Sequence, residues 1–129
     1  MVEEADEPVF IYTTFATREA AAQVGGQLVE ERVAACVNIY PGMVSIYSWE
    51  GTLEQAEEVG MLVKTRRARA EEAVAALERL HPYDTPAVLV IPTSGGSDNY
   101  RRWIKAMTEP AAEPPAAMEP GSESGPDGP

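Results

Sequence analysis

Few residues in this chain have side chains that bind transition metals. It contains one histidine, His81, and one cysteine, Cys36. Imidazole suits several divalent metals, and a cysteine sulfur is a soft ligand that suits Cu(I). One histidine supported only by carboxylates, such as Asp84 or those of another subunit, would make a weak and unselective site. His81 and Cys36 are therefore the candidate metal ligands.

Each candidate ligand also has a purely structural interpretation. His81 precedes Pro82, a position at which helices end. A histidine there caps carbonyl groups and interacts favourably with the helix dipole. Cys36 begins an apolar strand, where a cysteine behaves as a small hydrophobic residue. The sequence leaves both interpretations open for both residues.

Three polar residues within or beside apolar runs are candidates for a ligand-binding cleft between subunits. They are Asn38, Lys64 and Tyr83, and Lys64 belongs to a basic cluster at 64–69. Such a cleft would suit an anion. The alternative is ordinary internal hydrogen bonding, with Lys64 in an ion pair with Glu58 or the preceding glutamate.

No group of residues predicts catalysis. The single histidine and the single cysteine lie far apart in the sequence, and nothing indicates a Ser-His-Asp or Cys-His arrangement. The glycine-rich turn at 94–97 lacks the lysine and the spacing of a phosphate-binding loop. We therefore predict a protein that is not an enzyme and that has no organic cofactor.

The element that positions these residues is a long hairpin at 35–65. Apolar residues alternate along both of its arms, which indicates strands. Pro41 and Gly42 predict a bulge in the first arm, and Gly51 predicts the turn. Each arm is about twice the usual strand length of ~5–6 residues, so the tip would project from a domain of this size.

Aromatic residues are the candidate anchors of a subunit interface. The projecting hairpin tip carries Tyr47 and Trp49, which its own domain would leave in water. Exposed aromatic surface of this kind usually marks a partner. Trp103, near the end of the ordered chain, is the third predicted interface aromatic, because such residues dominate subunit contacts.

The remaining segments predict an α+β fold. Apolar runs indicate buried strands at 8–14 and 87–92, and helical periodicity indicates helices at 17–32, 70–80 and 100–107. With the hairpin, the order is β-α-β-β-α-β followed by an extra C-terminal helix. This order is typical of a ferredoxin-like βαββαβ sandwich.

Length and charge limit the class of protein. With 129 residues, 44% of them apolar, the chain can form one domain, which we place at 8–108. We expect residues 1–7 to be flexible and 109–129 to form a disordered, acidic, proline-rich tail. The formal net charge of -11 argues against a nucleic-acid partner or an anionic membrane. Without an apolar span or signal peptide, a cytoplasmic location is the default.

Five motifs follow one another in a family-specific order. They are AACVNI at 34–39, SIYSWEG at 45–51, MLVKT at 61–65, LHPYDTP at 80–86 and NYRRWI at 99–104. Together they resemble the CutA family of divalent-cation tolerance proteins over residues 9–107. The resemblance implies a homotrimer with a ferredoxin-like fold. It also implies an architecture like that of the PII signalling proteins and a role in tolerance of copper and other divalent metals.

The resemblance allows two functions. One is a homotrimer that binds copper or another divalent ion. The other is a PII-like sensor that binds a small anionic metabolite in the cleft between subunits. The copper ligands suggested for some family members are a cysteine, a His-His pair and a nearby glutamate. Here Thr13 and Leu80 stand in place of the cysteine and the first histidine, and Ala87 in place of the glutamate.

Overall fold

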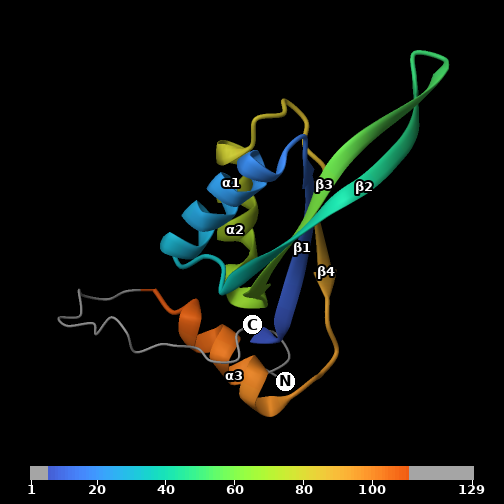
Figure 1. Ribbon diagram of the computed structural model, residues 1–129. Coiled ribbons are helices and arrows are strands. Elements are labelled where there is room, and N and C mark those ends of the chain that lie inside the picture. Colours follow the sequence, from blue (N-terminus) through green and yellow to red (C-terminus); the bar gives the residue numbers. More distant parts are fainter. Residues whose placement is uncertain (1–5, 111–129) are drawn as a thin grey trace.

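The computed structural model describes residues 6–110 (Figure 1). Residues 1–5 and 111–129 lie outside this range, so most of the predicted flexible N-terminus and of the predicted tail is not described. The elements are β1 (Pro8–Phe15), α1 (Arg18–Glu30), β2 (Cys36–Trp49), β3 (Thr52–Arg66), α2 (Arg67–Leu80), β4 (Leu89–Pro92) and α3 (Asp98–Met107). The four strands form one antiparallel sheet in the order β2-β3-β1-β4. The predicted ferredoxin-like fold is confirmed.

Both long helices cover the same face of the sheet, as Figure 1 shows. Alternate residues of β1 and β3 point toward them, and Ile11, Met61 and Val63 are fully buried there. Gly25 lets α1 approach the sheet closely, because a Cβ atom there would lie 2.7 Å from the Val37 Cγ2 atom. The core thus forms from alternate strand residues and from the close approach of α1 to the sheet at Gly25.

The two long helices begin in different ways. Thr17 caps α1, because its hydroxyl oxygen accepts a hydrogen bond from the Ala20 N–H at 3.1 Å. Helix α2 begins at Arg67 rather than at the predicted residue 70. A carboxylate oxygen of Asp6 accepts from the Ala68 N–H at 3.2 Å. The cap of α2 therefore comes from a distant part of the sequence, which the local pattern did not show.

The hairpin has the predicted bulge and turn. The register of β2 against β3 shifts between Tyr40 and Met43, on either side of Pro41 and Gly42. At the tip, Glu50 and Gly51 both have positive φ, 51° and 81°. Beyond the bulge the hairpin projects from the body of the domain (Figure 1). We call this projecting part, 43–58, the arm.

Strand β4 differs from the prediction of a buried strand at 87–92. It covers only Leu89–Pro92, and all four of its residues are exposed in the single chain. In the described part of the chain its one neighbour is β1, so it forms an edge of the sheet. An apolar run indicates that side chains avoid water, but it does not indicate whether the same chain or another one covers them.

Candidate functional site

The face of the sheet opposite α1 and α2 is left uncovered by these two helices (Figure 1), and we call it the open face. Side chains that alternate with the buried ones lie on it. They include Phe10, Tyr12, Cys36, Asn38, Tyr40, Leu62, Lys64, Leu89 and Ile91. This face is largely apolar, with Asn38 and Lys64 as its polar interruptions. Helix α3 packs at one end of the sheet against β3 and β1.

Lys64 lies on the open face among aromatic rings. Its Nζ donates a hydrogen bond to the Tyr100 hydroxyl at 3.2 Å and lies 5.8 Å from the centroid of the Phe10 ring. Among residues 6–110 it forms no ion pair, so the alternative of a Lys64 pair with Glu58 or the preceding glutamate is wrong for the single chain. The cation is instead held by a hydroxyl and two π systems.

Cys36 lies directly opposite Lys64 in the register of β2 and β3. Burial raises the pKa of the Cys36 thiol, although the Lys64 cation and the Tyr100 hydroxyl act in the opposite direction. A raised pKa keeps the sulfur protonated, whereas metals bind the thiolate. Cys36 must therefore lose its proton at some cost before it can bind a metal ion.

His81 is buried at the end of α2 with both ring nitrogens engaged. Its Nδ1 accepts a hydrogen bond from the Tyr83 N–H at 3.2 Å, and its Nε2 lies 2.8 Å from the Thr14 carbonyl oxygen. A nitrogen that accepts from a backbone N–H carries no proton. The proton is therefore on Nε2, which donates to Thr14. His81 caps no carbonyl of its own helix with its ring; it joins α2 to β1.

The surroundings of His81 favour its neutral form. The ring stacks on Phe15 with 4.2 Å between centroids. Burial lowers the pKa of His81, and the hydrogen bond to Thr14 offsets this only in part. A metal ion at His81 would have to displace one of its two hydrogen bonds.

Tyr83 belongs to a polar cluster that the sequence did not predict. Its hydroxyl donates to a carboxylate oxygen of Glu58 at 3.0 Å. Burial raises the pKa of the Tyr83 phenol, and the Glu58 carboxylate raises it further. Glu58 also accepts from the hydroxyls of Ser45 at 2.7 Å and Thr14 at 3.5 Å. We call Glu58, Ser45, Thr14 and Tyr83 the Glu58 cluster.

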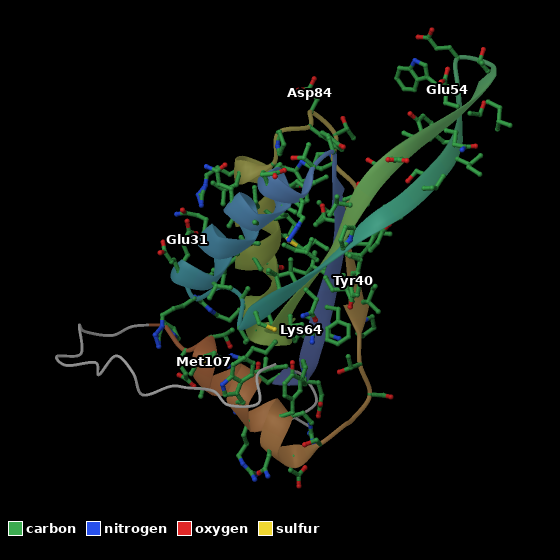
Figure 2. The ribbon with its side chains drawn as sticks, viewed as in Figure 1. Glu31, Tyr40, Glu54, Lys64, Asp84 and Met107 are labelled. Carbon is green, nitrogen blue, oxygen red and sulfur yellow. The ribbon has the colours of Figure 1, made fainter. Side chains whose placement is uncertain are left out.

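The three residues predicted to line one cleft are not brought together within a single chain. Asn38 and Lys64 share the open face, on neighbouring strands. Tyr83 lies on the α2–β4 connection next to Asp84, and Figure 2 shows Asp84 and Lys64 toward opposite ends of the body. Within residues 6–110 of one chain, only Asn38 and Lys64 lie on the same face, and a cleft between subunits stays a prediction.

The predicted interface aromatics lie in two places. Tyr47 and Trp49 are on the arm, where Trp49 is 60% exposed. Figure 2 shows Glu54, near this tip, far from the body of the domain. Trp103 is half-buried on α3 and stacks on Tyr100 with 5.7 Å between ring centroids. Trp103 is thus supported by its own chain, whereas the arm aromatics are not.

Residues 6–110 of one chain contain no group of three or more His, Cys, Asp or Glu side chains that could hold a metal ion. Thr13, at the position of the family's suggested cysteine ligand, is fully buried, and its hydroxyl has no hydrogen-bond partner. Leu80 is half-buried and Ala87 is exposed. Within this same range, no helix is long and apolar enough to cross a membrane.

The comparisons with known proteins agree with one another. The family model of the CutA1 divalent ion tolerance protein matches residues 9–107. A divalent-cation tolerance protein CutA of Pectobacterium atrosepticum is 42% identical over 100 residues, which are 78% of this chain and 91% of that protein. A chloroplastic CutA protein of Arabidopsis thaliana is 39% identical over 100 residues, and the chain spans only 55% of its length.

Solved structures show the same relationship. The crystal structure of the divalent ion tolerance protein CutA1 from Ehrlichia chaffeensis superposes with a TM-score of 0.78 at 30% identity, covering 81% of this chain and 97% of that one. A periplasmic divalent cation tolerance protein CutA from Archaeoglobus fulgidus gives 0.75 at 37% identity, with 79% and 99% covered. Because these relatives are named as chloroplastic and periplasmic, the cytoplasmic location stays a prediction. The chain itself belongs to the CutA family of divalent-ion tolerance proteins.

Proposed function

We propose that this chain acts as a non-enzymatic homotrimer in the tolerance of divalent metal ions, copper in particular. Membership of the CutA family and the names of its relatives support the role in metal tolerance. The copper preference and the number of three subunits come from the family resemblance. They are what the experiments below test.

The observation that carries the proposal of assembly is the large apolar surface of the single chain. On the open face, Leu89 is 66% exposed and Tyr40 is 51% exposed. On the arm, Leu53 is 76% exposed and Ile46 is 63% exposed. Contiguous apolar surface on this scale usually marks an interaction site.

The backbone supports the same proposal. Strands β2 and β4 are the two edges of the sheet, so each presents unpaired N–H and C=O groups. An apolar edge strand without charges, such as β4 with Leu89, Val90 and Ile91, is a surface that another strand can extend. Copies of the chain that pair along these edges would cover the arm and the open face together.

A metal site would then draw its ligands from more than one copy. One chain offers no set of three ligands within residues 6–110. Cys36 lies on the open face, which copies would share, and its sulfur suits Cu(I). His81 is the second candidate, provided that one of its hydrogen bonds opens. Binding of copper is therefore expected only in the assembled protein.

Native mass spectrometry before and after addition of copper tests both parts. The expected result is a trimer that takes up one or three copper ions. Cys36→Ser and His81→Gln are the variants that should reduce uptake, and Cys36→Ala distinguishes loss of the sulfur from a change in polarity. A monomer would overturn the proposed assembly. A trimer without specific copper uptake would overturn the copper site alone.

A second function is favoured by the position of Lys64. This half-buried cation faces the surface that copies would share and has no carboxylate partner among residues 6–110. An unpaired cation at such a position could bind an anionic metabolite, as in a PII-like sensor. Thermal-shift measurements with ATP test it. Lys64→Met should abolish a shift that Lys105→Met leaves in place, because Lys105 is an exposed lysine of α3 away from the open face. The absence of any shift would contradict this function.

A further inference from the structure

We propose that Glu58 fixes the direction of the arm relative to the body of the domain. Its carboxylate would do this by collecting hydroxyl groups from three separate segments. Glu58 is then a positioning residue for subunit contacts. Its effect on assembly, though not its effect on the arm itself, rests on the proposed function.

The contacts of the arm with the body are few. Pairing of β3 with β1 ends at Val59 and Phe15, so no body strand within residues 6–110 continues along the arm. Among residues 6–110, three side chains of the body donate hydrogen bonds to side chains of the arm: Tyr12, Thr14 and Tyr83. The Tyr12 hydroxyl contacts the Met43 sulfur at 3.8 Å, a weak interaction. The other two both end on Glu58.

The Glu58 cluster joins segments that are distant in the sequence. Ser45 belongs to the other strand of the arm, Thr14 to the end of β1, and Tyr83 to the α2–β4 connection. The bonds from Ser45 and Tyr83, at 2.7 Å and 3.0 Å, are direct, whereas the bond from Thr14, at 3.5 Å, is long. One side chain therefore ties both strands of the arm to two elements of the body.

The charge of Glu58 is what makes this arrangement strong. All its bonded partners in the part of the chain that the structure describes are hydroxyl groups, which donate to a carboxylate. Hydrogen bonds to an ionised acceptor are about twice as strong as neutral ones. An amide in its place has one accepting oxygen instead of two, and its N–H₂ group would face hydroxyls that now have to reorient.

His81 holds the backbone of two members of the Glu58 cluster. Its Nδ1 accepts from the Tyr83 N–H, and its Nε2 donates to the Thr14 carbonyl oxygen. The two residues whose hydroxyls hold Glu58 from the body are thus held by the same imidazole. This second set of bonds limits the positions from which Tyr83 can reach Glu58.

The arm amplifies any change at its base. The bulge at Pro41 and Gly42 interrupts the ladder there, and bulges are places where strands bend. At roughly 3.3 Å per residue, the seven residues from Met43 to Trp49 span about 20 Å. A rotation of about 10° at Glu58 would therefore move the tip by roughly 3–4 Å, enough to misplace Trp49 in an interface.

Spin-label distance measurements test this role. Labels are attached to Thr52→Cys at the tip and Gln23→Cys on α1, in a Cys36→Ser background. Labelled protein is mixed with an excess of unlabelled protein, so that one labelled copy is present in each assembly. Glu58→Gln should broaden the tip-to-body distance distribution at least twofold, and Tyr83→Phe should broaden it less. Glu57→Gln is the matched control, because Glu57 is an exposed neighbour outside the cluster.

The outcomes separate this inference from the proposed function. An unchanged distribution in Glu58→Gln would overturn the positioning role, whatever the oligomeric state. If Glu58→Gln does not fold, Tyr83→Phe and Ser45→Ala decide in its place. In native mass spectrometry, Glu58→Gln should dissociate at about tenfold higher protein concentration than Glu57→Gln. A wild-type monomer would overturn the proposed assembly, but the distance measurement would still decide the role of Glu58.

Discussion

The two halves of the long hairpin share one sequence pattern but differ in their surroundings. In the body, Val59, Met61 and Val63 alternate with open-face residues and are buried beneath α1 and α2. In the arm, Val44 and Ile46 alternate in the same way, yet they are 52% and 63% exposed. Alternation therefore predicts a strand with two unlike faces, but not the partner that covers the apolar one.

The difference separates the energy of folding from the energy of assembly. Side chains of the body are buried by the same chain, so their contribution is present in every copy. Side chains of the arm are not, so in the proposed assembly their contribution would depend on contact with another copy. Substitutions in the two halves should accordingly change different measured quantities.

Met61→Ala should have the largest effect, and it should act on the fold itself. Met61 belongs to β3 and is fully buried against α1. Removing a side chain of this size from a core costs about 2–5 kcal/mol. Urea unfolding followed by circular dichroism, at one fixed protein concentration, measures the loss. A loss as small as that of an exposed control on the arm, Gln55→Ala, would contradict the division between the halves.

Trp49→Ala should act on assembly and leave the fold of each copy intact. Trp49 is 60% exposed in the single chain, and tryptophan is prominent among residues that dominate interfaces. An aromatic anchor of an interface is worth about 2 kcal/mol or more, so its loss corresponds to roughly a 30-fold increase in the dissociation constant. Sedimentation velocity over a range of protein concentrations measures it, with Gln55→Ala as the control on the same arm.

One result for Trp49→Ala would contradict the role of the tip in assembly. If the variant assembles like the wild type while its circular dichroism spectrum is also unchanged, the tip is not part of the interface. The exposed aromatic residues of the arm would then need a different partner.

Acid should lower the free energy of unfolding through His81, which holds Thr14 and Tyr83 near the base of the arm. Burial lowers the folded-state pKa of His81 below its ordinary value of about 6.5. The unfolded chain therefore takes up the proton first as the pH falls. The stability contributed by neutral His81 is fully present above pH 6.5 and is lost as the pH falls through the lowered folded-state pKa.

Urea midpoints at pH 8, 6.5 and 5 measure this dependence. His81 is the only histidine of the chain, so His81→Gln should flatten the curve between pH 6.5 and 5 more than Asp84→Asn does. Equal slopes in the wild type and in His81→Gln would show that carboxylates cause the whole dependence.

Local patterns were sufficient to predict most of the fold. Alternation gave the strands of the hairpin, Pro41 and Gly42 gave the bulge, and helical periodicity gave a first helix that begins near residue 17. The cap of α2 by Asp6 was missed because the two segments meet only in the folded chain. The prediction that the apolar run at 87–92 forms a buried strand was wrong, because β4 lies at an edge of the sheet.

The candidate site was less predictable than the fold. His81 was singled out as a candidate metal ligand, and that role stays a prediction. Its two hydrogen bonds involve Thr14 and Tyr83, which local sequence does not relate to it. The Glu58 cluster joins residues from four segments, so no spacing rule could find it. Sequence patterns record what each residue tends to do locally, whereas polar clusters depend on which segments tertiary folding brings together.

The two adjacent glycines of α1 give the smallest predicted effects, and these have opposite signs. A Cβ atom at Gly25 would lie 2.7 Å from the Val37 Cγ2 atom and 3.2 Å from the Met61 sulfur. Overpacking of a core costs roughly 1–3 kcal/mol, and the better helix propensity of alanine returns about 1 kcal/mol. Gly25→Ala should therefore destabilise by about 1 kcal/mol.

Gly26 is the matched comparison, because a Cβ atom there would have nothing within 4 Å. Gly26→Ala should stabilise by about 0.5–1 kcal/mol, since alanine restricts the unfolded chain and favours the helix. Urea unfolding of both variants measures the two signs side by side. If both alanines stabilise, then α1 can move away from β2 and β3 at little cost. The body half of the hairpin would then be packed less tightly than the contacts of Met61 indicate. Its packing would differ less from that of the arm than the burial of Met61 indicates.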